Sequence, residues 1–147
     1  MNLYKFSFQS EVKAVNPLVK KTLKQIKNHF SFISLEEEGD LCLVLSELLY
    51  NAVIHGNKQN AEKIVDLYVE IKENSVRCVV ADEGFGFDYK RFLDRFKNME
   101  NKNIILESDH GRGILLAVSL SDGLTFNSKG NEVTFKKYLN SGAGRDE

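Results

Sequence analysis

The sequence predicts an α+β fold, a two-layer α/β sandwich in which a mixed, mostly antiparallel sheet carries helices on one face. The expected order of elements is strand, helix, helix, two strands, a variable connection, helix and two strands. Neighbouring strands joined by short turns favour antiparallel hairpins, and the helices then gather on one side of the sheet. A doubly wound parallel sheet would need βαβ crossovers, which this order mostly lacks.

Composition narrows the function classes. The chain has 147 residues, 42% hydrophobic and 28% charged, which favours a single domain over residues 1–140 with a flexible tail over 141–147. The net charge of -1 provides no global attraction to nucleic acid or to an anionic membrane. The two cysteines, Cys42 and Cys78, lack metal-ligand spacing and fit small buried thiols in a reducing compartment. We therefore expect a cytoplasmic protein with no direct nucleic-acid or membrane partner.

The first two elements are a strand over residues 3–10 and a helix. Asn16 and Pro17 predict the helix start, with Asn as N-cap and Pro at the first helical position. The helix is expected to run to about Phe30. Its apolar stripe consists of Val19, Leu23, Ile26 and Phe30.

The second helix carries the most informative residues and is expected to end near Gly56-Asn57. Glu47 and Asn51 are four residues apart, which places both side chains on one helix face. The rest of this segment is mostly apolar, and isolated polar groups are costly to bury. A divalent metal with its nucleotide phosphates would supply partners, because hard cations take oxygen ligands.

The remaining elements alternate between hairpins and helices. The expected elements are strands over 63–72 and 75–81 turning at Glu73-Asn74, a connection over 87–110 with a short amphipathic helix (Tyr89, Phe92, Leu93, Phe96, Met99), a helix over 114–120 stopped by Asp122-Gly123, and a hairpin of 124–127 with 132–139 turning at Lys129-Gly130-Asn131.

Two glycine-containing corners are candidate ligand sites. Asp82, Gly84 and Gly86 follow the second hairpin strand, where a carboxylate can accept a hydrogen bond from an exocyclic amine and glycines let backbone approach a base. An ordinary turn is the alternative. Residues 108–114 open the last helix, where backbone amides and Arg112 could bind phosphate. The alternative there is a capped helix start.

Taken together, three motifs resemble those of a known superfamily. Glu47-x-x-x-Asn51-Ala52-x-x-His55-Gly56 resembles the N box of the GHKL, or Bergerat-fold, ATPases. Asp82-x-Gly84-x-Gly86 resembles their G1 box, and Gly111-Arg112-Gly113 resembles their G2 box. Within the superfamily, the short lid, the small size and the helix start Asn16-Pro17 resemble the bacterial anti-sigma-factor serine kinases. The resemblance covers about residues 3–139.

The resemblance implies a role for each matching residue. It makes Glu47 the catalytic general base, Asn51 the Mg²⁺ ligand and Asp82 the partner of the adenine amino group of ATP. Gly84 and Gly86 would leave room beside the base. The phosphate-holding residues would be Gly111, Arg112 and Gly113, under a lid formed by residues 87–110. His55 occupies a family position without an independent role, and a core or helix-end histidine is the simpler interpretation.

One position departs from the family pattern. The family often has Gly-Thr-Thr before its last strand, and the second Thr supports adenine recognition. Here Gly130 is followed by Asn131 and Glu132, so Glu132 stands where a Thr is expected. Thr134 lies on the same strand face by the two-residue period and is a candidate replacement.

The leading hypothesis is an ATP- and Mg²⁺-dependent serine-protein kinase that acts as an anti-sigma factor. It would bind a sigma factor, phosphorylate a serine of a small anti-sigma-factor antagonist, and form a homodimer. One alternative is a nucleotide-gated binding regulator without phosphoryl transfer. Another is a detached histidine-kinase catalytic domain, although the surroundings of His29 lack the acidic and Pro context of a phosphoacceptor motif.

Overall fold

The computed structural model describes residues 2–86 and 109–139. The elements are β1 (Asn2–Gln9), the 3-10 turn η1 (Val12–Ala14), α1 (Val15–Asn28), α2 (Leu35–Asn51), the π-helical turn η2 (Ala52–Gly56), β2 (Ile64–Ile71), β3 (Ser75–Ala81), α5 (Asp109–Leu120), β4 (Gly123–Phe126) and β5 (Glu132–Tyr138). The amphipathic helix predicted around Tyr89–Met99 and the predicted tail over 141–147 lie outside the described residues.

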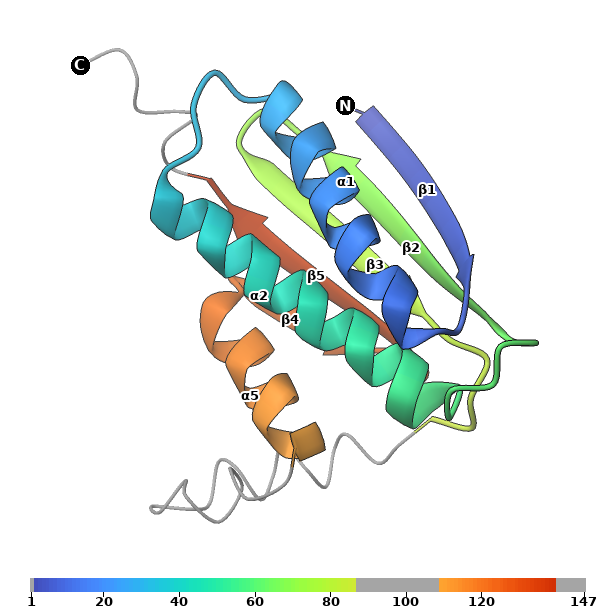
Figure 1. The fold of residues 1–147 in the computed structure, drawn as a ribbon. Helices are drawn as coiled ribbons and strands as arrows, with labels where there is room; N and C mark the ends of the chain where they lie inside the picture. The colour runs from blue at the N-terminus through green and yellow to red at the C-terminus, as the bar shows by residue number, and fades with distance from the viewer. Residues whose placement is uncertain (1, 87–108, 140–147) are drawn as a thin grey trace, which may run out of the picture.

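The five strands form one sheet in the order β1-β2-β3-β5-β4. Every strand pairing in the described part of the chain is antiparallel, so the parallel component that the prediction allowed is not found there. Figure 1 shows α1, α2 and α5 on the same face of this sheet. The structure therefore confirms the predicted two-layer α+β architecture.

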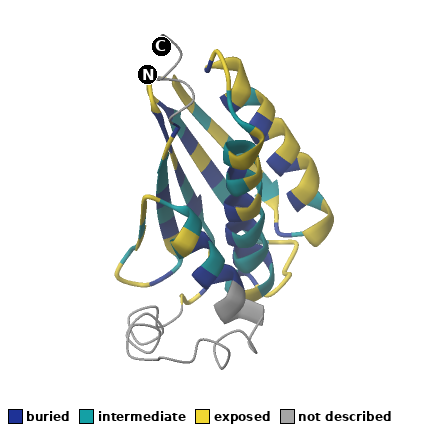
Figure 2. Ribbon diagram, turned by 90° about the vertical axis from the view of Figure 1, so that its left-hand side faces the viewer, coloured by how far each residue is buried: buried dark blue, intermediate teal, exposed yellow. Residues whose placement is uncertain are grey.

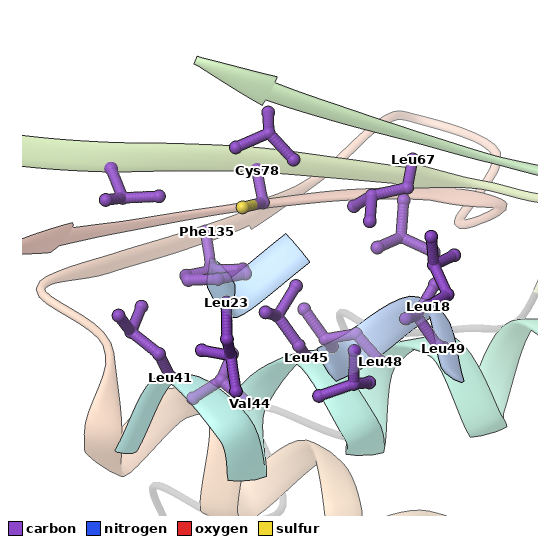
Figure 3. Close-up of a cluster of buried hydrophobic side chains, with 14 of the residues drawn as sticks. Leu18, Leu23, Leu41, Val44, Leu45, Leu48, Leu49, Leu67, Cys78 and Phe135 are labelled. Carbon is purple, nitrogen blue, oxygen red and sulfur yellow. The ribbon is translucent and has the colours of Figure 1, made fainter. Parts of the chain in front are cut away.

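The core lies between the helices and one sheet face. Every second side chain is buried along β2 and along most of β3 and β5, which gives the banded strands of Figure 2. The opposing leucines and valine of α2 point toward Leu67, Cys78 and Phe135 of the sheet (Figure 3). Burial raises the pKa of the Cys78 thiol, so this side chain stays neutral and packs as a small apolar group.

The start of α2 is fixed by a capping box. The Ser34 hydroxyl accepts a hydrogen bond from the Glu37 backbone N–H at 3.0 Å, and the Glu37 carboxylate accepts one from the Ser34 N–H at 3.1 Å. Such reciprocal bonds satisfy two amides that a helix leaves without internal partners. At its other end α2 continues through η2 to Gly56, which confirms the predicted stop near Gly56-Asn57.

Two predicted helix starts were wrong. Asn16 is not the N-cap of α1, because the 3-10 turn η1 leads directly into a helix that begins at Val15 with Ala14 as N-cap. The Asn16 side chain instead accepts a hydrogen bond from the Tyr50 hydroxyl. The last helix begins at Asp109 rather than near Ile114, and it ends at Leu120 as predicted. None of the helices in the described ranges is long and apolar enough to cross a bilayer.

Candidate nucleotide site

Glu47 and Asn51 of α2 face the start of α5. An ideal Cβ placed on Gly113 would lie 2.5 Å from Glu47 Oε2 and 3.6 Å from Asn51 Nδ2. Since 2.5 Å is closer than a real Cβ approaches another heavy atom, a side chain at residue 113 would force the end of the Glu47 side chain to move. The structure thus brings Glu47 and Asn51 together with Gly113, the last residue of the predicted G2 box.

Asp82 stands at a corner formed with Gly56 and Gly84. The Gly84 N–H donates to Asp82 Oδ1 at 2.7 Å. A side chain on Gly56 would overlap the Asp82 carboxylate, and one on Gly84 would overlap the Gly56 carbonyl. The end of the N box and the G1 box are therefore packed directly against each other, which the separate motifs in the sequence did not show.

The environment of Asp82 disfavours its charge. Burial raises the pKa of this carboxyl above its ordinary value, while the Gly84 N–H and the positive charges of Lys63 and Lys129 act in the opposite direction. A hydrogen-bond donor on a ligand would stabilise the charged form of such a half-buried carboxylate.

The β4–β5 turn supports this corner from the other side. Gly86 has a φ of +84°, and a side chain there would overlap the Lys129 carbonyl. The Asn131 carbonyl accepts from the Asp82 N–H at 2.9 Å, and the Asn131 side chain donates to the Gly84 carbonyl at 3.3 Å. Asn127 Oδ1 fixes the turn itself by accepting the backbone N–H groups of Gly130, Asn131 and Glu132.

These elements surround one hollow. Its non-atom space is about 460 Å³, part of it open to solvent. Its lining residues are Leu48, Asn51, Ala52, His55, Gly56, Val80, Asp82, Gly86, Ile114, Phe126, Gly130, Asn131, Glu132 and Val133. Asn51 and Asp82 therefore share a hollow. Glu47 lies one helical turn from Asn51 and against Gly113, next to the lining residue Ile114.

The other predicted residues are placed as follows. Gly111 and Arg112 belong to the first turn of α5, and the side chains of residues 109–112 lie outside the described part, so their phosphate-binding role stays a prediction. His55 is exposed, lies in η2 and lines the hollow, so it is at the helix end and not in the core, and the position alone assigns it no role. Glu132 lines the hollow but Thr134 does not, so Thr134 is not placed to replace the missing threonine.

Asn57 is a supporting residue that the sequence reasoning missed. Its side chain is buried, with the residue 1% exposed. Its Oδ1 accepts from the Glu83 N–H at 2.8 Å and its Nδ2 donates to the Ile64 carbonyl at 3.1 Å. The Glu83 carboxylate in turn accepts from the Ile64 N–H. Asn57 thereby ties the end of η2 to the residue beside Asp82, whereas its sequence position indicated only a helix stop.

The donor set suits a metal that arrives with phosphates. No cluster of three or more His, Cys, Asp or Glu side chains exists among the described residues to hold an ion by itself. Mg²⁺ commonly binds through one or two protein oxygens together with substrate phosphates and water. Asn51, which lines the hollow one helical turn from the Glu47 carboxylate, carries one such side-chain oxygen and fits that pattern.

Comparison with known proteins identifies the family of this chain. The model of the histidine kinase-like ATPase domain matches residues 8–137. Serine-protein kinase RsbW from Staphylococcus aureus strain MSSA476 is 32% identical over 103 residues, which is 68% of this chain and 65% of the relative. The RsbW proteins of strains MW2 and JH9 match over the same shares at 32% and 31% identity. The chain thus spans 65% of the length of these relatives. The chain belongs to the histidine kinase-like (GHKL) ATPase domain family, and an ATPase domain implies ATP binding.

Proposed function

We propose that the protein is an ATP-dependent serine-protein kinase that acts as an anti-sigma factor. One observation carries the proposal: Glu47 and Asn51 on one helix face lie against Gly113, and Asn51 shares its hollow with Asp82. This arrangement would put a base and a metal ligand near the phosphates of a nucleotide whose adenine reaches the Asp82 corner. The RsbW relatives are named serine-protein kinases, which supports phosphoryl transfer as the activity.

At the phosphate end, each polar side chain has a separate task. Glu47 would accept the proton of the incoming serine hydroxyl, a role that contributes typically about 10²–10⁴-fold in rate. Asn51 would give its side-chain oxygen to Mg²⁺. When bound, Mg²⁺ neutralises the charge on the phosphates. The first-turn amides of α5, including those of Gly111 and Arg112, would hold phosphate oxygens.

At the adenine end, Asp82 would accept a hydrogen bond from the exocyclic amine. The corner is preorganised, because Gly84 fixes one carboxylate oxygen and Asn131 fixes the backbone on both sides of it. Gly86 and Gly130 line the hollow without side chains that would cover the base. A charge-assisted bond of this kind is worth about 1.5–3 kcal/mol.

We propose a sigma factor and a small antagonist protein as partners, and a homodimer as the assembly. Support comes from the resemblance of the three motifs to the anti-sigma-factor kinases and from the RsbW relatives. The antagonist would carry the acceptor serine and would compete for the same kinase. Light scattering of the purified chain measures the assembly directly.

A second candidate is a nucleotide-gated regulator that binds partners without transferring phosphate. The observation that favours it is Glu132, a carboxylate at the wall of the hollow in place of a threonine. A negative charge beside the ligand would weaken the binding of a polyanionic nucleotide. The Asp82 corner would then still sense the nucleotide.

One experiment separates these candidates. The tagged protein is incubated with an extract of its native cell, with and without Mg-ATP, and the captured proteins are then exposed to γ-³²P-ATP. The kinase proposal predicts a sigma factor among the captured proteins and an acid-stable phosphoserine on a second, smaller protein. Nucleotide-dependent capture without any label would favour the regulator, and an acid-labile label would indicate histidine phosphorylation.

A further inference from the structure

Lys137 breaks the pattern of its strand. Val133 and Phe135 of β5 point into the core, and the two-residue period puts Lys137 on the same side of the sheet. Its pairing partner on β3, Val76, is fully buried. The Lys137 side chain is only 13% exposed. A charged group at a core-facing position requires partners, since burying an unpaired charge is costly.

Its ammonium group joins two helices. Lys137 Nζ lies 3.4 Å from Asp40 Oδ2 of α2 and donates to the Leu120 carbonyl of α5 at 2.9 Å. Leu120 is the last residue of α5, where carbonyl groups lack internal partners and a positive charge is favoured by the helix dipole. One side chain from the sheet therefore holds α2 and the C-terminal end of α5 together.

The Lys137 link and the Glu47–Gly113 contact join the same faces of α2 and α5. Asp40 precedes Glu47 by seven residues on α2, and Leu120 follows Gly113 by seven residues on α5. Seven residues are about two helical turns, or about 10 Å, and return to the same helix face. The two helices run in opposite directions (Figure 1). The Lys137 link and the Glu47–Gly113 contact are therefore two points of a single antiparallel alignment.

We propose that Lys137 is a positioning residue, which holds α5 against α2 in the register that brings Gly113 to Glu47. Lys137 is outside the set of residues that line the hollow, so it acts through α5 and not on the ligand. The expected effect of Lys137 on phosphoryl transfer rests on the proposed function, whereas its expected effect on the position of α5 does not. Loss of the link would free the C-terminal end of α5 while leaving the Asp82 corner, which is built from other elements, in place.

The structural part is tested by NMR on the protein labelled with ¹⁵N-glycine. In Lys137→Met the Gly113 amide resonance should move, while those of Gly84 and Gly86 should stay. Lys137→Arg should restore the wild-type position, because a guanidinium can reach both partners. Lys136→Met is the matched control, since Lys136 lies on the other face of β5 and its ammonium sits over the Tyr138 ring.

A second variant covers the case in which Lys137→Met does not fold. Asp40→Asn keeps Lys137 and its bond to Leu120 but weakens the link to α2, so it should move the Gly113 resonance in the same direction by a smaller amount. An unmoved Gly113 resonance, or equal movement of Gly84, in the folded variants would overturn the proposal.

The activity readout uses Mg-ATP and the serine acceptor identified by labelling. A displacement of about 1 Å in a catalytic arrangement can cost on the order of 100-fold in rate. We expect kcat to fall by roughly tenfold or more in Lys137→Met, with a far smaller change in KM for ATP and recovery in Lys137→Arg. If the wild-type protein transfers no phosphate, the kinase proposal fails and the NMR result still decides the role of Lys137. A fall in kcat without movement of Gly113 would contradict the positioning role.

Discussion

Glu47 Oε2 lies 2.5 Å from the place where a Cβ of residue 113 would be, so the carboxylate occupies the space that Gly113 leaves open. The two residues lie 66 positions apart in the chain, Glu47 in α2 and Gly113 in α5. A glycine inside a helix costs about 1 kcal/mol relative to alanine, and in α5 it leaves the Glu47 carboxylate in this position. It also makes the position of Glu47 sensitive to a single methyl group.

Gly113→Ala is expected to displace the Glu47 carboxylate. The added methyl would improve helix propensity, but overpacking typically costs about 1–3 kcal/mol, so unfolding by urea should show little net gain or a loss. Phosphoryl transfer should fall by roughly tenfold or more, because the base moves relative to its target. Single-turnover transfer from γ-³²P-ATP measures the rate.

The matched control is Gly39→Ala in α2. A Cβ at Gly39 would meet no atom within 4 Å, so only helix propensity should change. The free energy of unfolding should rise by about 0.5–1 kcal/mol, with transfer unchanged. If Gly113→Ala behaved like Gly39→Ala in both assays, the Glu47–Gly113 contact would affect neither stability nor phosphoryl transfer.

Asp82→Asn should weaken ATP binding. The amide loses the charge that strengthens the bond to the adenine amine, worth about 1.5–3 kcal/mol, so the Kd measured by calorimetry should rise roughly tenfold or more. GTP, which lacks the exocyclic amine at that position of the ring, is the control ligand and should bind weakly to both proteins. An unchanged Kd for ATP would remove the adenine assignment.

The same variant should change the pH dependence of stability. Burial raises the folded-state pKa of Asp82, so its contribution to stability is fully present below the ordinary carboxyl pKa and is lost as pH rises through the raised value. Asp82→Asn cannot ionise and should gain stability relative to wild type as pH increases above about 4. Urea unfolding at pH 3.5 and pH 7 tests this prediction. The free energy of unfolding of Asp82→Asn minus that of wild type should rise with pH, and a fall between pH 3.5 and pH 7 would contradict it.

Asn57→Ala should destabilise the corner that carries Asp82. It leaves the Glu83 N–H and the Ile64 carbonyl without their buried partner, at an expected cost of about 1–3 kcal/mol in the free energy of unfolding. Asn60→Ala is the control, because Asn60 is exposed and its side-chain oxygen accepts from the Glu62 N–H in an exposed turn. Equal losses in the two variants would mean that the Asn57 bonds do not secure the corner.

Glu132→Thr should strengthen ATP binding. The substitution removes a negative charge from the wall of the hollow and supplies the hydroxyl that the family resemblance leads us to expect at this position. Calorimetry should show a lower Kd, with the gain reduced at high salt because screening weakens the charge term. Thr134→Val is a control outside the hollow and should leave the Kd unchanged; a weaker affinity in Glu132→Thr would show that Glu132 contacts the ligand favourably.

Local patterns predicted the existence of most elements in the described chain. Alternation gave the strands of both hairpins, and the apolar stripe Val19, Leu23, Ile26 and Phe30 is buried as expected. These predictions succeed because burial on one face imposes a fixed period on the sequence. The capping box Ser34-x-x-Glu37 marks the start of α2 and was not among the predicted features.

The failures lie where tertiary contacts override local preference. Gly111 and Gly113 favoured a non-helical entry, yet α5 begins at Asp109. Within α5, Gly113 is explained by its contact with Glu47, which no window of the sequence contains. Asn57 and Asn131 look like ordinary turn residues, and only the fold shows that they hold the two sides of the Asp82 corner.

The central claim is that Glu47 acts on the incoming hydroxyl and not in holding the nucleotide. The most direct measurement compares Glu47→Gln with wild type, by calorimetry for Mg-ATP and by single-turnover transfer to the serine acceptor. The account predicts a similar Kd and a transfer rate lower by on the order of 10²–10⁴-fold. Transfer by Glu47→Gln at the wild-type rate would contradict it. So would a fall in transfer that is fully accounted for by weaker binding of Mg-ATP.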